Sequence, residues 1–346
     1  MSSLTCILKK TILLIILASG IFAALQAQDV YFSQFFMNPV YLNPSYAGTM
    51  KVPRAGVQYR DQWPGMDKAY STYFASFDTY IPKISSGIGL LLFNDVQGNG
   101  LYTETCFKFI FSKEIRINRE WTMYGSITAG AQVNSLNFNR LIFSDGIDPT
   151  NGQLLPSAET PPDNNNHMFP DFGTGVLVFN DQYFFGISAE HLAEPDQSLY
   201  SDYSHALPRK YTMHLEVNLP WFLSGHWRKF CKLNPNFIIQ SQGKEQNITY
   251  GIYANRKGIS LGLWNRLTTH KSSDLILMAG FIGKELKTAI SYDMNLHGIG
   301  LQSHGAIEIS ISYTLKDPGK KSIFPFYDEN RNGGYTFLVG RFWFSF

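Results

Sequence analysis

The feature that most constrains this chain is an alternation of apolar and polar side chains, repeated over segments of about ten residues. In 211–219, Tyr211 and Leu215 share one face, whereas His214 and Glu216 fall on the other. A period of two is typical of β-strands whose two faces differ chemically. The chain is therefore predicted to be all-β, with about 14 strands to within two. The alternating segments lie near residues 55–60, 69–78, 86–95, 100–114, 120–136, 172–179, 182–190, 211–219, 234–242, 246–255, 258–266, 273–283, 286–294, 306–315 and 334–346.

Two architectures suit so many alternating strands, namely a soluble sandwich or propeller and a transmembrane antiparallel β-barrel. Strands of about ten residues suit a tilted crossing of a bilayer. The chain ends with Phe342, Phe344 and Phe346 on one strand face. This ending resembles the C-terminal insertion signal of bacterial outer-membrane barrels. Together these features favour a single barrel domain spanning residues 28–346.

The N-terminus has the pattern of a secretory signal peptide. Lys9 and Lys10 precede an uncharged apolar run over 11–25, and Ala27 supplies a small residue at the expected cut. A retained membrane anchor is disfavoured, because the run is shorter than about 18 residues. We therefore expect residues 1–27 to be removed after Sec-dependent export. For a barrel, this predicts a location in the outer membrane of a Gram-negative cell.

Composition excludes several classes of protein. Charged residues make up 16% and aromatic residues 15% of the chain, which is the opposite of a disordered composition. The mean hydropathy of -0.13 is too polar for a bundle of membrane helices. Loss of Lys9 and Lys10 with the signal reduces the net charge from +2 to 0, so nucleic acid is not an expected partner. The aromatic side chains near predicted strand ends are expected to form membrane-interface girdles: Tyr102, Trp121, Tyr124, Tyr183, Tyr211, Tyr250, Tyr292, Tyr313 and Tyr335.

Motifs for catalysis, cofactors and metals are missing, since no GxSxG, Walker loop, HExxH or paired CxxC occurs. We therefore predict no catalytic, cofactor-binding or metal-binding residue. Cys106 and Cys231 are equally compatible with one bridge or two free thiols. Glu190 and His191 stand near Glu194 and Asp196, but neighbouring strand residues point to opposite faces, so this group is interpreted as a solvated turn.

His214 and Glu216 share a face that should point into the lumen, where interior polar packing is the expected role. Residues 144–170 are rich in Pro, Asn and Asp and are predicted to form an exposed loop.

The opening segment 28–50 of the expected mature chain contains two Asn-Pro pairs, Asn38-Pro39 and Asn43-Pro44. A residue before proline is disfavoured in the helical region, so the segment should be compact and turn-rich, with several aromatic anchors. Three placements stay open: a plug at the barrel base, a surface for a periplasmic partner, or packing inside the barrel that closes it.

The same opening resembles the PorP/SprF family of membrane proteins from type IX secretion and gliding systems. The matching words are Phe32-Ser33-Gln34, Asn38-Pro39 and the run NPSYAG over 43–48. Further matches include YRDQWP over 59–64, PDFG over 170–173 and IEISISY over 307–313. About 30 residues follow the last of these motifs, which departs from the family pattern. Either the chain has an extra hairpin arm, or the alignment of its strands with the family slips near the end, so the strand count stays open there.

The resemblance implies a non-enzymatic outer-membrane component of the type IX secretion and gliding machinery. Its expected partners are outer-membrane lipid, the translocon or a periplasmic ring lipoprotein, and an exported cargo or adhesin with a C-terminal sorting domain. The alternative is a general or substrate-specific porin, and a barrel enzyme is disfavoured by the missing motifs. The partner-binding residues that the family words point to are Phe32, Gln34, Asn38, Pro39, Asn43, Pro44, Tyr46 and Gly48.

Overall fold

The computed structural model describes residues 29–66, 69–148, 150–162, 164–200, 202–219, 232–269, 273–283, 285–296 and 304–315. The predicted signal peptide, Cys231 and the predicted strand over 334–346 with its terminal Phe residues lie outside the described residues. Within the described part of the chain, no helix is long and apolar enough to cross a bilayer.

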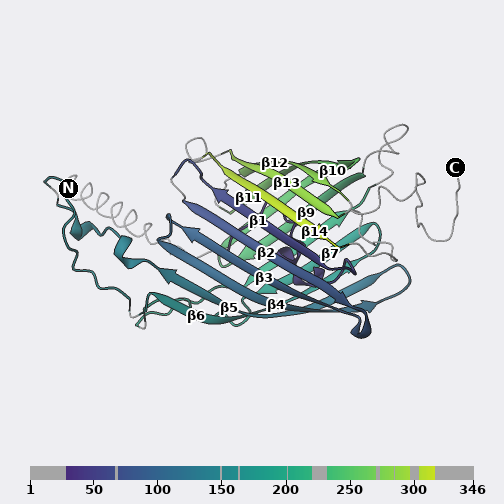
Figure 1. Ribbon diagram of the computed structural model, residues 1–346, viewed down its shortest axis with the longest axis horizontal. Helices are drawn as coiled ribbons and strands as arrows, with labels where there is room; N and C mark the ends of the chain where they lie inside the picture. The colour runs from purple at the N-terminus through teal and green to yellow at the C-terminus, as the bar shows by residue number, and fades with distance from the viewer. Residues whose placement is uncertain are drawn as a thin grey trace, which may run out of the picture.

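Fourteen antiparallel strands form one closed barrel (Figure 1), which confirms the predicted architecture and strand number. Each strand pairs with its sequence neighbours, and β1 closes the barrel on β14, with Val57 opposite Ile311. Closure leaves no open edge along the ring, as a lipid-embedded sheet requires. The strands are β1 Arg54–Gln62, β2 Tyr70–Ile81, β3 Ser86–Gln97, β4 Tyr102–Arg116, β5 Thr122–Leu136, β6 Asn166–Phe179, β7 Tyr183–Glu190, β8 Lys210–Val217, β9 Lys232–Gln242, β10 Glu245–Arg256, β11 Ile259–Thr268, β12 Ser273–Ile282, β13 Leu286–Asn295 and β14 Ala306–Thr314.

The alternation in the sequence becomes the two faces of the wall. In β8, Tyr211 and Leu215 point outwards and are exposed, whereas His214 points inwards and is buried. The same pattern recurs in β14, where Ile307, Ile309 and Ile311 form part of an apolar outer belt. Apolar outer and polar inner faces are the arrangement of a membrane β-barrel.

The two mouths of the barrel differ in their connections. At one mouth, residues 137–165 join β5 to β6 and residues 191–209 join β7 to β8, so we call it the long-loop mouth (Figure 1). The first of these loops contains two short 3-10 turns, η3 Phe138–Arg140 and η4 Ser144–Gly146. At the other mouth most connections have two to five residues, such as the turn η2 Pro82–Ile84 between β2 and β3. We call that end the short-turn mouth.

The predicted loop over 144–170 is wrong at its end, because β6 begins at Asn166 and includes Pro170. The richness of this segment in Pro, Asn and Asp is the reason that the sequence predicts a loop as far as Pro170. However, β6 pairs with β7 only over Thr174–Phe179, so its first residues have β5 as their one strand partner. A strand with one free side tolerates proline, because the missing N–H removes no ladder bond there.

The girdle prediction fails at Tyr124. This side chain is on the same face of β5 as Ser126, is fully buried in the lumen and accepts a hydrogen bond from Lys51. The alternation of side chains along β5, rather than the position of Tyr124 near a strand end, decides that this side chain points into the lumen. Other predicted girdle residues do lie exposed on the outer face: Tyr183, Tyr211, Tyr250, Tyr292 and Tyr313.

Candidate functional site

The lumen contains the N-terminal segment 29–53, which we call the plug. It has two short helical turns, α2 Pro39–Leu42 and η1 Pro44–Tyr46. Each turn starts with proline, whose fixed φ suits the first helical position, and each proline follows a non-helical asparagine. Asn43 also accepts a hydrogen bond from the backbone N–H of Ser45 at 2.9 Å, which caps η1. The two Asn-Pro pairs therefore mark the starts of the two helical turns.

The plug runs from one mouth of the barrel to the other. At its first residue, the backbone N–H of Asp29 donates to Gln242, which ends β9 at the long-loop mouth. At its far end, Lys51 pairs with Glu114 near the end of β4, at the short-turn mouth. The chain then enters β1 at Arg54. Its N-terminal end thus lies at the mouth opposite the one where β1 begins.

Near the long-loop mouth, Glu308 of β14 holds the plug by its backbone. The N–H groups of Ser33 and Gln34 donate to the two Glu308 carboxylate oxygens at 2.9 and 2.7 Å. Arg60 of β1 compensates the carboxylate at 3.0 Å and reaches Asp293 of β13 at 2.8 Å. Glu308 is completely buried, so this pairing is what makes its burial tolerable. We call these residues the Glu308 cluster.

In the middle of the barrel, Asn43 is fitted against a wall of glycines. Its side-chain N–H groups donate to the carbonyls of Val176 and Ile187 at 3.1 and 3.3 Å. A Cβ on Gly175 would lie 2.4 Å from the Asn43 Oδ1 atom, and one on Gly186 would lie 2.7 Å from Nδ2. The wall strands omit side chains where the asparagine sits, which explains two glycines on otherwise regular strands.

At the short-turn mouth, Gly48 and Gly87 bring the plug and β3 into backbone contact. Gly48 has a φ of 73°, and a Cβ on Gly87 would lie only 2.1 Å from the Ala47 carbonyl oxygen. The Gly48 N–H donates to Asp78 at 2.8 Å, and Arg54 pairs with the other oxygen of the same carboxylate at 2.8 Å. The glycine of the NPSYAG word is therefore required by both its conformation and its neighbour.

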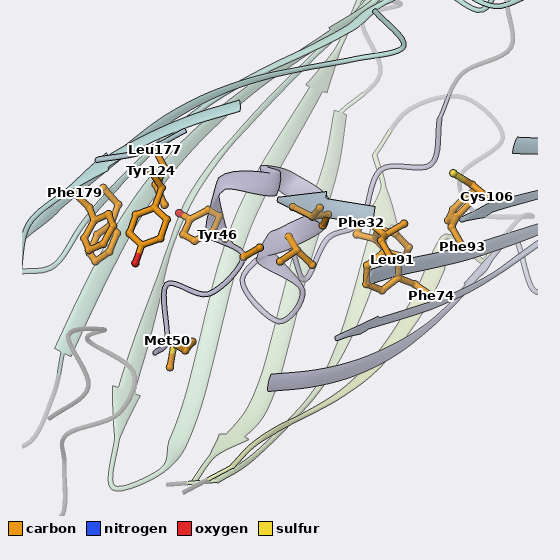
Figure 2. Packing of buried hydrophobic residues seen from close by; sticks show 14 residues of the cluster. Phe32, Tyr46, Met50, Phe74, Leu91, Phe93, Cys106, Tyr124, Leu177 and Phe179 are labelled. Carbon is orange, nitrogen blue, oxygen red and sulfur yellow. The ribbon is translucent and has the colours of Figure 1, made fainter. Parts of the chain in front are cut away.

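Aromatic side chains fill the space between plug and wall. Phe36 stacks on Trp264 of β11, with ring centroids 5.9 Å apart, and Phe32 meets Phe74 of β2 edge-on at 5.6 Å. Figure 2 shows Phe32 and Phe74 on one side of the helical turns, with Tyr46 on the other side near Tyr124. A large share of the aromatic content thus packs inside the barrel rather than at the lipid surface.

Asp29, the first residue of the plug, belongs to a charged cluster at the long-loop mouth. The Asp29 carboxylate lies 3.0 Å from the His191 Nε2 atom and 3.1 Å from the Lys210 Nζ atom. Gln242 donates to its other oxygen at 3.1 Å. Burial favours the neutral form of Asp29, but Lys210 and then His191 outweigh burial and hold its pKa well below the usual value. We call these four residues the Asp29 cluster.

His191 corrects the interpretation of 190–196 as a solvated turn. The residue is buried, and its Nδ1 atom lies 3.0 Å from Asp171 of β6. β7 ends at Glu190, and His191 has a φ of 56°, so strand alternation no longer applies and both side chains enter one network through Lys108 and Asp171. Burial lowers the pKa of His191, but Asp29 and then Asp171 raise it to about 9 overall.

The structure places all the predicted partner-binding residues along the plug. Pro39 is half-buried, and the other seven are buried against the lumen wall: Phe32, Gln34, Asn38, Asn43, Pro44, Tyr46 and Gly48. Sequence reasoning missed the wall residues that hold them, such as Asp78 and Glu308. One sequence feature could have identified such wall residues, namely a single charged residue on the inward-facing side of an otherwise uncharged strand, as Glu308 is in IEISISY.

His214 and Glu216 point inwards, as predicted. His214 lies 3.3 Å from Asn43, and Glu216 accepts a hydrogen bond from Tyr253 at 2.6 Å. Together with Arg54 and Lys287 they line a cavity between plug and wall. Cys106 is a buried free thiol. Among the described residues, no group of three or more His, Cys, Asp or Glu side chains has the arrangement of a metal site.

Comparison with known proteins identifies the class of this barrel. The family model described as "Type IX secretion system membrane protein PorP/SprF" matches residues 24–313, up to the penultimate residue of β14. The chain therefore belongs to the PorP/SprF family of type IX secretion system membrane proteins. This is a family of secretion-system membrane proteins rather than of enzymes. No curated protein matches the chain.

Solved structures with similarity to the chain include several porins. The outer membrane protein Omp33 of Acinetobacter baumannii has 6% identity, a TM-score of 0.44 and coverage of 78% of this chain and 100% of its own. The NanC porin has 10% identity, a TM-score of 0.37 and coverage of 76% and 100%. The KdgM porin in complex with disordered oligogalacturonate has 5% identity, a TM-score of 0.37 and coverage of 76% and 99%. Similarity this remote carries no information about function.

Proposed function

We propose that this protein acts by binding, as the outer-membrane component that holds an exported cargo or adhesin domain for the type IX machinery. The supporting observation is the plug. Its hydrogen bonds and ion pairs reach strands all around the ring, including β1, β2, β4, β8, β9, β13 and β14. A lumen filled in this way suits a binding protein better than a diffusion channel.

The two mouths suit different partners. Outer-membrane barrels have short periplasmic turns and longer extracellular loops. By this rule the long-loop mouth faces outwards and offers exposed side chains such as Leu154 and Tyr203 to cargo. The short-turn mouth then faces the periplasm, and exposed cationic residues such as Arg119 and Lys257 lie on the surface that the ring or translocon would meet.

The family words of the plug have a structural role in this proposal. Asn43 and Gly48 fix the plug to the wall, so the plug supports the surface at each mouth rather than presenting these side chains to a partner. A partner-binding role for the opening segment would fall to its end at the long-loop mouth, where the Asp29 side chain is 21% exposed.

Site-specific crosslinking in living cells tests the proposal. A photo-crosslinking residue replaces Tyr203 at the long-loop mouth, Lys257 at the short-turn mouth, or Phe109 on the outer belt as the matched control. We expect proteins with a C-terminal sorting domain at Tyr203, machinery components at Lys257 and neither class at Phe109. The porin alternative predicts no such adducts at either mouth and loss of small-solute uptake when the gene is deleted.

A further inference from the structure

The wall at the long-loop mouth contains a set of donors that converge on one carboxylate. Lys210 and His191 reach the Asp29 Oδ2 atom at 3.1 and 3.0 Å, and Gln242 reaches Oδ1 at 3.1 Å. These three wall residues are 4%, 2% and 2% exposed, so their side chains are fixed by their surroundings. The carboxylate that they bind belongs to the plug and not to the wall.

The wall donors need an anion at this position. Lys108 is already paired with Asp171 and Glu190. Lys210, by contrast, forms its ion pair with Asp29 and also contacts the hydroxyl of Tyr41 and the rings of Tyr31 and Tyr41. Glu190, opposite Lys210 on β7, is a further acidic neighbour but is itself paired with Lys108. A buried ammonium group is costly without an opposite charge, so an empty site would favour another anion.

The pattern of donors and acceptors matches an amino-acid residue rather than a simple anion. Gln242 donates from Nε2 to the carboxylate and accepts at Oε1 the backbone N–H of Asp29, at 2.9 Å. The site therefore recognises a carboxylate together with an N–H of the same residue. Aspartate, or the last residue of a peptide, carries both groups, whereas phosphate and sulfate carry no such donor.

The position of Asp29 makes the exchange of this ligand feasible. It is at the outer end of the plug, and the next hydrogen bonds from plug to wall are those of Ser33 and Gln34 with Glu308. Release of Asp29 thus leaves the Glu308 cluster intact. The Asp29 side chain is 21% exposed and lies at the mouth from which a partner would enter.

We infer that Lys210, His191 and Gln242 form a peptide-carboxylate site at the long-loop mouth, which Asp29 fills within the chain and which a partner's aspartate or C-terminal carboxylate takes over. The identity of the partner as a protein rests on the proposed function. The site itself does not, because its donors, burial and present ligand belong to this chain. Exchange at this site would free the first residues of the plug when a partner binds.

Chemical rescue of the full-length Asp29→Ala variant tests the site with acetate as the probe. In chloride, the purified variant should lose several degrees of unfolding temperature, because Lys210 and His191 lose their shared anion. Acetate at the same ionic strength should restore at least half of that loss. The Asp29→Ala/Lys210→Met double variant should show no acetate effect. Glu194→Ala, which breaks the exposed Arg209 pair at the same mouth, is the matched control and should not distinguish the two salts.

Equal unfolding temperatures of Asp29→Ala in acetate and chloride would overturn the site, as would an equal acetate effect in the double variant. If Asp29→Ala does not fold in chloride, refolding is the readout: acetate should restore the folded, heat-modifiable band on a gel, and failure in both salts contradicts the inference. No cargo is used. A failed rescue therefore leaves the secretion role standing, and failed crosslinking to cargo leaves a positive rescue standing.

Discussion

The Glu308 cluster and the Asp29 cluster hold the same plug in different ways. Glu308 accepts two backbone N–H groups of the plug and is 0% exposed, whereas Asp29 offers a side chain that is 21% exposed. In the first cluster the wall supplies the carboxylate, and in the second the plug does. We therefore interpret the Glu308 cluster as a permanent contact of the plug and the Asp29 cluster as a contact in which another carboxylate can replace that of the plug.

Glu308→Gln should have the largest effect, because it removes one of the two carboxylates that compensate buried Arg60 and the charge that accepts two N–H groups of the plug. Loss of one partner of a buried ion pair costs about 3 to 5 kcal/mol. Unfolding in urea measures the change, and Ile309→Val, on the outer face of the same strand, is the control. A loss no larger than that of Ile309→Val would contradict the permanent role given to this cluster.

Gly87→Ala should have the next largest effect, since its new methyl group would meet the Ala47 carbonyl oxygen at 2.1 Å. Overpacking of this kind costs about 1 to 3 kcal/mol. Gly125→Ala is the control, because a Cβ on Gly125 meets nothing within 4 Å. Calorimetry measures the unfolding temperatures of both variants. Similar values for Gly87→Ala and Gly125→Ala would mean that the plug and β3 are not in contact.

Asn43→Ala removes the cap of η1 and two donors to wall carbonyls. Loss of the cap costs about 1 kcal/mol, and loss of each hydrogen bond to a wall carbonyl costs at least about 0.5 kcal/mol, so we expect a destabilisation of about 2 kcal/mol in urea. Asn94→Ala removes an exposed hydrogen bond to Thr105 and serves for comparison. If the two variants are equally stable, the asparagine of the NPSYAG motif does not stabilise the protein through its hydrogen bonds to η1 and the wall.

The last expected effect is a pH dependence in the Asp29 cluster. The pKa of His191 is raised to about 9, so its contribution to stability is complete below the unfolded value of 6.5 and is lost as pH rises through about 9. The difference in unfolding free energy between the wild type and His191→Gln should therefore shrink between these pH values. A constant difference would show that His191 does not hold Asp29 as an imidazolium ion.

The barrel was predictable because its signal is local. Alternation over ten residues sets the direction of every side chain, so strands such as β8 and β14 appear in the sequence with their faces assigned. Prediction failed where parity or turn geometry overrides position, as at Tyr124, Pro170 and His191. At Pro170 the residue type misled, at Tyr124 the position near a strand end did, and at His191 the strand alternation was extended past the end of β7.

The site was only half predictable. The Asn-Pro words mark the plug, but its contacts join residues far apart in the chain, such as Gln34 and Glu308. No local pattern reports that a glycine in β3 faces Ala47 or that Asp29 meets Lys210. These pairings depend on the closed ring of strands, which brings the end of the sheet back to its beginning.

Electrical recording in a planar bilayer tests the central claim, that the plug closes the lumen and the protein works by binding. The full-length wild type should insert without stable ion-conducting steps, and Glu308→Gln should show openings as the plug loses its buried contact. Wild-type steps as large and as frequent as those of Glu308→Gln would contradict a closed lumen and favour a porin.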